Sequence, residues 1–157
     1  MPARAFVVGV ISDTHGLLRA EAVDALRGSD MIIHAGDVGK SEVIDRLREV
    51  APLRVVRGNI DRKSWAAALP MTDVVEVGDH RFFVLHDIAD LDVDPVAAGF
   101  AAVVFGHSHR PSIETRNGVL FLNPGSAGPR RFKLPITVAR VKTSGRHIRA
   151  DIVDLGP

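Results

Sequence analysis

The stretch AAVVFGHSH, residues 101–109, joins an apolar run to a turn that carries two histidines. A short apolar run bounded by a turn signal is typical of a strand that is buried on both faces of a sheet. Gly106 allows the backbone to turn sharply at the end of this predicted strand, and His107 and His109 follow it. Two imidazoles that flank a single residue favour a metal site over a surface loop.

Four further clusters of ligand-type side chains precede this stretch, each after an apolar run. They are Asp13-Thr14-His15, Gly36-Asp37, Gly58-Asn59 and His86. In open α/β folds, functional residues collect at the carboxyl ends of strands, so one rim of the fold would bring all five clusters together. A turn or a structural histidine explains each cluster alone, whereas five in order indicate one site. His34 lies inside a predicted strand, and we expect it to pack beside the site rather than to be a ligand.

Predicted strands and helices alternate over the first hundred residues, and the rest of the chain is rich in strands. The predicted helices span residues 18–26 and 41–50, with a short third one at Pro95–Ala98. The predicted strands are Ala5–Ile11, Met31–His34, Leu53–Val56, Val74–Val77, Arg81–Leu85, Ala101–Phe105, Ser112–Thr115, Val119–Leu122, Ile136–Val141 and His147–Val153. These strands are too many for one small open sheet. We therefore predict an α/β fold of two mixed β-sheets packed as a sandwich and flanked by helices.

Length and composition set modest bounds. A chain of 157 residues fits one domain, which we place at residues 1–157. The net charge of +1 gives no signal for nucleic acid or membrane, and the absence of cysteine excludes disulfides, thiolate metal sites and a cysteine nucleophile. The apolar run Ala5–Ile11 is too short to span a bilayer and lacks a cleavage pattern. We therefore expect a cytoplasmic protein.

The candidate ligands form a mixed oxygen and imidazole set. They are Asp13, His15, Asp37, Asn59, His86, His107 and His109. This set suits Mn, Fe, Co, Ni or Zn better than Mg or Ca, and we favour Mn. Seven ligands exceed what one ion needs, which suggests two divalent transition-metal ions that share a carboxylate. Such pairs lie about 3.5–4 Å apart and clamp both oxygens of an in-line displacement at phosphorus.

These residues, in this order, resemble the calcineurin-like metallophosphoesterase superfamily, and especially its small single-domain bacterial and archaeal phosphodiesterases. The resemblance runs from Val7 to about Arg131 and implies the metallophosphoesterase fold, a two-sheet α/β sandwich. It implies one metal bound by Asp13, His15, the bridging Asp37 and His109, and another bound by Asp37, Asn59, His86 and His107. It also implies that a hydroxide between the metals attacks phosphorus. Asp37, Asn59 and His86 are the residues that we assign to catalysis.

A loop that small members carry beside the site has a counterpart here. It comprises Asn123-Pro124-Gly125-Ser126 and Pro129-Arg130-Arg131. Asn, Pro, Gly and Ser form turns for purely local reasons, so one interpretation is that the segment is only a turn. The other is that Ser126 and one of the two arginines, Arg130 or Arg131, bind the phosphate of the substrate, for which a guanidinium offers a bidentate grip.

Two positions depart from the family pattern. Ile60 stands where many members carry a histidine that is proposed to protonate the leaving group, and Ile60 has no proton to donate. The following Asp61 is expected to support His15 or nearby backbone. Asp87 stands where small members usually carry glycine, in a segment with three more carboxylates. This segment is either a solvated loop that caps the helix at Pro95–Ala98 or an acidic rim that disfavours polyanions.

We therefore predict a metal-dependent phosphodiesterase that acts on a small-molecule phosphoester. Two other classes stay open. One is a protein-interaction scaffold, non-catalytic or with a dual role, as the retromer subunit of this fold is thought to be; the complete ligand set favours catalysis over a pure scaffold. The other is a nuclease, which the small size and the lack of an evident basic stripe disfavour. No membrane association is expected, and edge strands near the C-terminus leave a homo-oligomer open.

Overall fold

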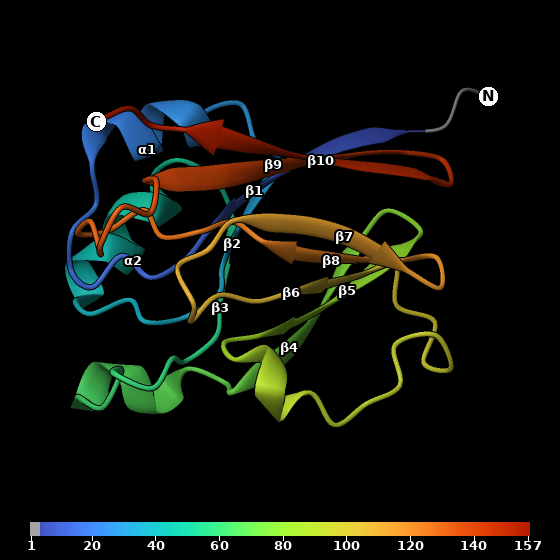
Figure 1. Cartoon of the computed structure of the whole chain (residues 1–157), viewed down its shortest axis with the longest axis horizontal. Coiled ribbons are helices and arrows are strands. Elements are labelled where there is room, and N and C mark those ends of the chain that lie inside the picture. The colour runs from blue at the N-terminus through green and yellow to red at the C-terminus, as the bar shows by residue number, and fades with distance from the viewer. Residues whose placement is uncertain (1–3) are drawn as a thin grey trace.

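A computed structural model describes residues 4–157, which form two five-stranded sheets and a few short helices (Figure 1). The helices are α1 (Ala20–Leu26), α2 (Ser41–Arg48) and two 3-10 helices, η1 (Ser64–Ala68) and η2 (Ile88–Asp90). The strands are β1 (Ala5–Ile11), β2 (Met31–His34), β3 (Leu53–Val55), β4 (Thr72–Val77), β5 (His80–Leu85), β6 (Ala102–Val104), β7 (Ser112–Arg116), β8 (Val119–Asn123), β9 (Thr137–Ser144) and β10 (His147–Asp154).

Each sheet mixes parallel and antiparallel pairs. The first, here called sheet 1, has the order β10-β9-β1-β2-β3, and the second, sheet 2, has the order β4-β5-β6-β8-β7. In sheet 1, β1, β2 and β3 are parallel, β9 pairs with β1 in antiparallel fashion, and β10 pairs with β9 in antiparallel fashion. In sheet 2, β5, β6 and β8 are parallel, with antiparallel β4 and β7 at the edges. The predicted pair of mixed sheets is confirmed.

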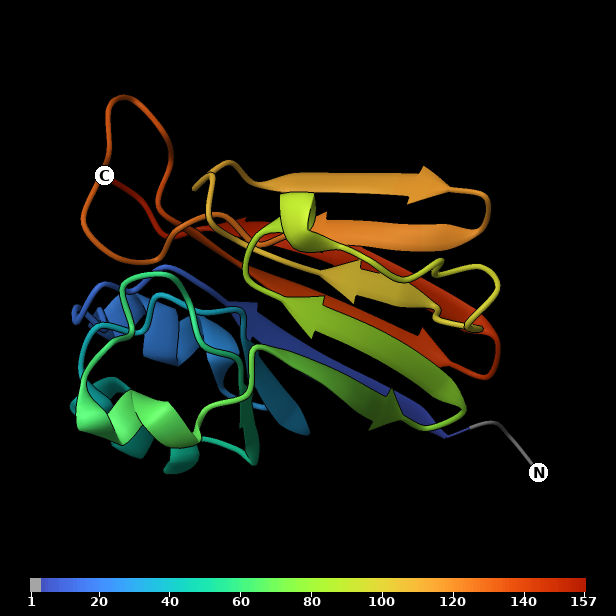
Figure 2. The same cartoon turned by 90° about the horizontal axis from the view of Figure 1, so that it is seen from below.

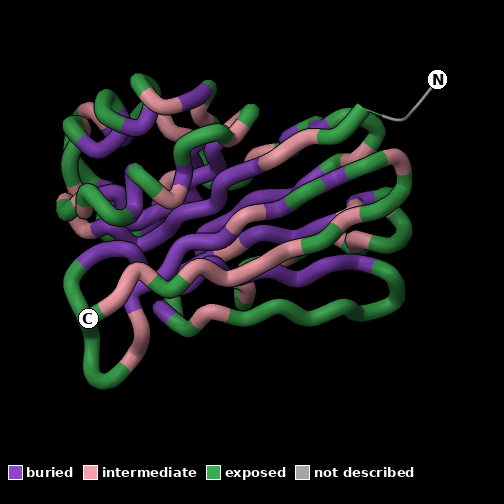
Figure 3. The backbone as a smooth tube through the Cα atoms, turned by 90° about the horizontal axis from the view of Figure 1, so that it is seen from above, coloured by how far each residue is buried: buried purple, intermediate pink, exposed green. Residues whose placement is uncertain are grey.

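The main core lies between the two sheets (Figure 2). Successive side chains of a strand point to opposite faces, and β5 follows this rule. Phe82 and Val84 of β5 join the core between the sheets, where Val8 of β1 also lies. Phe83 and Leu85 point to the outer face of sheet 2 and join a separate cluster. Burial therefore follows the central strands, while the outlying loops are exposed (Figure 3).

The outer faces of the two sheets are covered differently. On sheet 1, α1 and α2 contribute Leu26 and Leu47 to a cluster with strand residues, and Figure 1 shows both helices at one side of the molecule. On sheet 2, the connecting segment 86–101 covers the face instead, and Phe100 packs on Phe83 with ring centroids 5.2 Å apart. Helices therefore flank sheet 1, and the predicted helix at Pro95–Ala98 is wrong. Those residues form turns: the Asp94 carboxylate accepts the N–H groups of Val96 and Ala97 as a helix cap would, but the N–H of Phe100 then donates to the carbonyl oxygen of Pro95, five residues back, and no helical ladder follows.

The carboxyl ends of β1, β2, β3, β5 and β6 lead into loops that contact one another. The N–H of Asp13 donates to the carbonyl oxygen of Gly36 at 3.0 Å, and the N–H of His15 donates to that of Asp37 at 3.0 Å. The loops after β5 and β6 are joined in the same way, between Gly106 and His86. One rim of the sandwich thus gathers the five ligand clusters. Within residues 4–157, no helix has both the length and the apolar character needed to cross a membrane.

Candidate metal centre

The rim brings the predicted ligands into two groups. In each group the ligand atoms lie within 4.8 Å of one another. The groups are Asp13, His15 and His109, here called group A, and Asp37, His86 and His107, here called group B. Asn59 belongs beside group B, because its Oδ1 atom lies 3.2 Å from Nδ1 of His107. All seven side chains named from the sequence therefore meet at this rim.

The carboxylate of Asp37 stands between the two groups. Its Oδ2 atom lies 3.2 Å from Nε2 of His86 in group B and 3.6 Å from Nε2 of His15 in group A. The carboxylate of Asp13 is also central, with Oδ1 3.4 Å from Nε2 of His109 and 3.8 Å from Nε2 of His86. A single oxygen of Asp37 is thus within reach of ligands from both groups, which is the position that a shared carboxylate needs.

Several buried polar atoms at this rim lack a hydrogen-bond partner in the described chain. They include Oδ1 of Asp13, Nε2 of His15 and Nε2 of His86. The two nitrogens lie next to the Asp37 carboxylate, and Oδ1 of Asp13 lies 3.8 Å from Nε2 of His86. Buried polar atoms are nearly always paired, because an unpaired one loses its hydration without compensation. Nitrogen and carboxylate atoms that converge in this way suit divalent metal ions, so the residues present fit a metal site.

The remaining polar atoms of the same side chains are held by the protein. Nδ1–H of His86 donates to the carbonyl oxygen of Ala35 at 2.8 Å, which leaves Nε2 free as a ligand atom. Oδ1 of Asp37 accepts the N–H of Ile60 at 3.1 Å, which leaves Oδ2. Oδ2 of Asp13 accepts a hydroxyl and a backbone N–H, which leaves Oδ1. These three ligands are therefore oriented before any ion binds.

The backbone of this rim is conformationally unusual. Among the described residues, seven non-glycine residues have positive φ, and five of these belong to the ligand set. The five are Asp13 (54°), His15 (47°), Asp37 (57°), His107 (73°) and His109 (63°). Left-handed backbone is unfavourable for residues with a side chain, and such strain concentrates at functional sites. The fold thus holds these side chains in place at a conformational cost.

Two glycines allow the ligand loops to approach one another. A Cβ atom on Gly58 would collide with the backbone and side chain of Asp37. A Cβ atom on Gly106 would lie 2.6 Å from Oδ2 of Asp13. These glycines are required by the close contact of one ligand loop with another.

Asp61 ties two of the ligand loops together. It is buried, and its Oδ2 atom accepts the N–H groups of Gly58 at 2.9 Å and Val38 at 3.1 Å. Its Oδ1 atom accepts the N–H of Gly39 at 3.0 Å. Of the two roles expected for Asp61, the structure supports the contact with backbone rather than with His15.

His34 performs a similar task between the loops after β1 and β2. His34 is fully buried, and its Nδ1 atom accepts the N–H of Gly36 at 3.1 Å. The ring proton therefore lies on Nε2, and Nε2–H donates to Oγ1 of Thr14 at 3.0 Å. The Thr14 hydroxyl donates in turn to the carbonyl oxygen of Val38 at 2.8 Å. Burial lowers the pKa of His34 to about 4. His34 is therefore a neutral, packed residue with both nitrogens engaged, as expected from the sequence.

We expect His34 to make the metal-free protein less stable in acid. The unfolded chain protonates this imidazole near pH 6.5, whereas the folded chain keeps it neutral to about pH 4. The free energy of unfolding should therefore fall as the pH drops from 6.5 towards 4, by up to roughly 3 kcal/mol from this residue. Urea unfolding at several pH values measures it. His34→Gln should flatten the dependence, and the exposed-site control His147→Gln should not. Equal slopes in all three proteins would contradict the assignment.

The charged groups of the rim perturb one another. Burial alone would lower the pKa of His86, but the carboxylates of Asp37 and Asp13 raise it above its usual value. Burial alone would raise the pKa of Asp37, but hydrogen bonding to His86 and the N–H of Ile60 hold it below its usual value. For His15 burial prevails, and its pKa is lowered. The Asp37 carboxylate is thus ionised near neutral pH and available to a cation.

The predicted phosphate loop lies next to group A. Arg130 and Arg131 line a pocket of about 180 Å³ together with His15, His109 and Pro129. Both arginines are exposed. This flank of the rim is therefore basic.

Ser126, in contrast, is turned into the protein. It is buried, and its hydroxyl donates to the carbonyl oxygen of Asp13 at 3.0 Å. The same hydroxyl oxygen accepts the N–H of Gly128 at 3.3 Å. A contact between Ser126 and a substrate would require these bonds to break, so in this structure the residue holds the Asp13 loop.

Sequence reasoning did not assign a role to Asn123. This buried side chain donates from Nδ2 to the carbonyl oxygen of Gly106 at 3.1 Å and to Oγ of Ser108 at 3.2 Å. Its Oδ1 atom accepts the N–H of Gly125 at 2.9 Å. Asn123 thus fixes the turn that carries His107. Its main partner is 17 positions away in the sequence, so no local pattern signals the role.

Comparison with known proteins places this geometry in context. The model of the calcineurin-like phosphoesterase superfamily domain matches residues 6–146. A probable metallophosphoesterase of Methanothermobacter thermautotrophicus is 32% identical, over 96% of this chain and 93% of that protein. A phosphodiesterase of Methanocaldococcus jannaschii is 26% identical, over 75% of this chain and 82% of that protein. Vacuolar protein sorting 29 of Cryptosporidium parvum superposes with a TM-score of 0.77, over 96% and 97% of the two chains, and its 18% identity shows a shared fold alone.

Proposed function

The chain belongs to the calcineurin-like phosphoesterase superfamily and is a metal-dependent phosphoesterase, and from this premise we propose that it is a phosphodiesterase with two metal ions. Group A and Asp37 would hold one ion, and group B with Asn59 would hold the other. The position of Oδ2 of Asp37, 3.2 Å from His86 and 3.6 Å from His15, supports a carboxylate shared by two ions. The name of the similar archaeal phosphodiesterase supports the choice of a diester.

The chain's own residues position the reacting groups. When bound, the ions would supply a nucleophile from water and neutralise charge on the phosphoryl oxygens. Backbone groups hold Oδ1 of Asp37 and Nδ1 of His86, which leaves Oδ2 and Nε2 for an ion at the place where the phosphoryl group would lie. Asn59 is oriented instead by a side chain, because Nδ1 of His107 lies 3.2 Å from its Oδ1 atom. Arg130 or Arg131 would bind a phosphoryl oxygen from the flank of group A.

We expect activity to depend on a transition metal, with Mn better than Mg. Four of the seven proposed ligands are imidazoles, and imidazole prefers the softer ions. Metal-free protein should be reloaded with single metals and assayed with bis-p-nitrophenyl phosphate, and binding of each metal should be measured by calorimetry. Recovery of most activity with Mg, and little with Mn, Co or Ni, would contradict the proposed site chemistry.

Removing the guanidinium that binds phosphate should weaken substrate binding and leave the metals in place. Arg130→Ala and Arg131→Ala are the two tests, and one of them should raise KM by about 10- to 100-fold. This range follows because a hydrogen bond to a charged group contributes about 1.5–3 kcal/mol. Lys133→Ala, in the same exposed loop, is the matched control. If neither arginine variant differs from this control, the loop is only a turn.

A further inference from the structure

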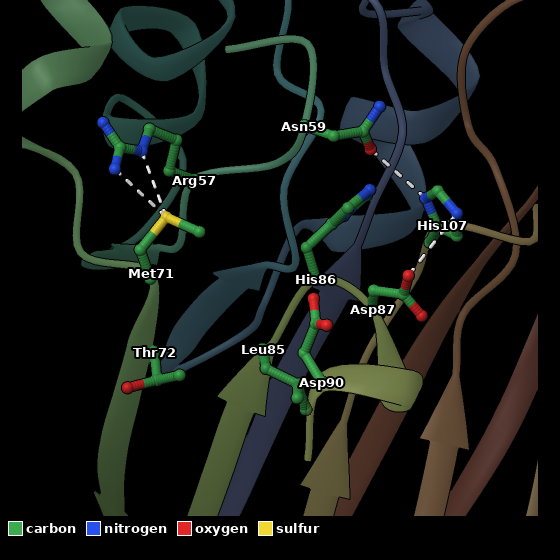
Figure 4. A pocket seen from close by; sticks show the side chains of 9 residues that line it. All are labelled: Arg57, Asn59, Met71, Thr72, Leu85, His86, Asp87, Asp90 and His107. Carbon is green, nitrogen blue, oxygen red and sulfur yellow. Dashed lines mark hydrogen bonds and ion pairs between the residues drawn. The ribbon is translucent and has the colours of Figure 1, made fainter. Parts of the chain in front are cut away.

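A pocket opens beside group B, whereas the pocket lined by Arg130 and Arg131 adjoins group A. The pocket beside group B has a volume of about 150 Å³ (Figure 4). Its lining residues come from the loops after β3 and β5, from the start of β4 and from the turn after β6. The pocket includes Asn59, His86 and His107, so a group bound in it would adjoin the proposed reaction centre. The inference below rests on the proposed function, because it concerns the substrate of that same site.

One side of the pocket is apolar. Met71 supplies its exposed apolar surface, with 57% of the residue exposed, whereas Leu85 also lines the pocket but is buried. The guanidinium of Arg57 lies against the sulfur of Met71, at 3.1 and 3.2 Å, at the edge of the pocket (Figure 4). An apolar cavity of about 150 Å³ accommodates a benzene molecule. The pocket therefore has room for one ring or a short alkyl group.

The other side of the pocket carries two carboxylates. Asp87 and Asp90 line it, and Figure 4 shows the Asp90 carboxylate directed towards the space below His86. Oδ1 of Asp87 accepts the N–H of Ala89, while its Oδ2 atom lies 3.6 Å from Nε2 of His107. With Arg57 as the one opposing cation among the lining residues, the acidic side chains outnumber the basic ones. An anionic group that lies against Asp87 and Asp90 would be repelled by both carboxylates, whereas an N–H or O–H donor there would find acceptors.

We propose that this pocket binds one ester group of the phosphodiester, and that it selects an alcohol with a small apolar body and an ammonium or other donor group. The apolar body would lie on Met71, and the donor would face Asp87 and Asp90. A second phosphate or a carboxylate on this ester group is disfavoured. The basic flank formed by Arg130 and Arg131 lies beside group A, so the two flanks of the rim differ in the charge they accept.

Binding of unreactive methyl diesters tests this assignment without relying on turnover. The Mn-loaded protein should be titrated calorimetrically with methyl 2-aminoethyl, methyl propyl and methyl 2-carboxyethyl phosphate, which share one phosphoryl centre and differ in one group. The aminoethyl diester should bind about three-fold more tightly than the propyl diester, because an exposed ion pair contributes only a modest free energy. The carboxyethyl diester should bind more weakly than either of them. Asp90→Asn should remove the preference for the ammonium, and Asp92→Asn, an exposed carboxylate of the same segment outside the pocket, should retain it.

The apolar side is tested with methyl phenyl phosphate. Met71→Ala should weaken its binding about four-fold relative to dimethyl phosphate, because the loss of about one methylene of apolar contact changes affinity by this factor. Met71→Leu retains an apolar side chain and should not weaken it. Hydrolysis of bis-p-nitrophenyl phosphate is measured in parallel and tests the proposed function by itself. A protein that hydrolyses this diester yet shows no ammonium or phenyl preference overturns the pocket assignment alone. Preferences that persist unchanged in Asp90→Asn and Met71→Ala overturn it as well.

Discussion

Replacing Asp37 with asparagine is expected to abolish phosphoester hydrolysis and to release at least one metal ion. The change keeps the size of the side chain and an oxygen for the N–H of Ile60. It removes the negative charge that lies between Nε2 of His86 and Nε2 of His15. Two dications that share one carboxylate repel each other more strongly without it. Since a catalytic metal contributes several kcal/mol, turnover should fall about a thousandfold or more.

Elemental analysis after gel filtration gives the metal content, and bis-p-nitrophenyl phosphate gives the turnover. Asp45→Asn, an exposed carboxylate on α2, is the matched control and should retain both metal and activity. Melting curves of the metal-free proteins separate a loss of metal from a loss of fold. Full metal content together with full turnover in Asp37→Asn would refute the shared role of this residue.

The strands could be predicted because their signals are local. Alternation in β5 separates Phe82 and Val84 from Phe83 and Leu85, and Asn117-Gly118 takes the left-handed backbone that a tight hairpin needs, with φ of 51° and 80°. The covering of sheet 2 could not be predicted. Segment 86–101 covers that face because Phe100 packs on Phe83, and this contact depends on tertiary packing. In the turns at residues 95–98, the Asp94 carboxylate accepts the N–H of Val96.

The candidate ligands could also be named from the sequence, because each follows the carboxyl end of a strand and parallel strands share that end. The supporting network could not. Thr14 pairs with His34 across 20 positions, and Asn123 reaches Gly106 across 17. The burial of Ser126 and the pocket at Met71 likewise depend on how the two sheets meet. The metal-binding roles of the seven side chains, the number of ions and the oligomeric state stay predictions.

The side chains around the reaction centre set a second expectation, about the leaving group. Ile60 occupies the position where a proton donor would be useful, and its side chain offers none. His34 is no substitute, because it is fully buried and both ring nitrogens are engaged. Departure of the leaving oxygen would therefore proceed without a positioned general acid, which typically contributes about 10²–10⁴-fold to the rate.

We therefore expect rates to depend steeply on the pKa of the leaving group. Nitrophenolate departs readily without a proton, whereas an alkyl or ribose oxygen does not. Bis-p-nitrophenyl phosphate should therefore be hydrolysed well. Unactivated alkyl or nucleotide diesters should be hydrolysed about 10²–10⁴-fold more slowly than by an enzyme with a positioned general acid. A series of methyl aryl phosphodiesters with graded leaving-group pKa measures the dependence, and the methyl group keeps the rest of the substrate constant. Ile60→His should flatten the dependence if the new imidazole reaches the leaving oxygen. A flat series for the unmodified protein, with the chemical step rate-limiting, would mean that another side chain or a metal-bound water donates the proton.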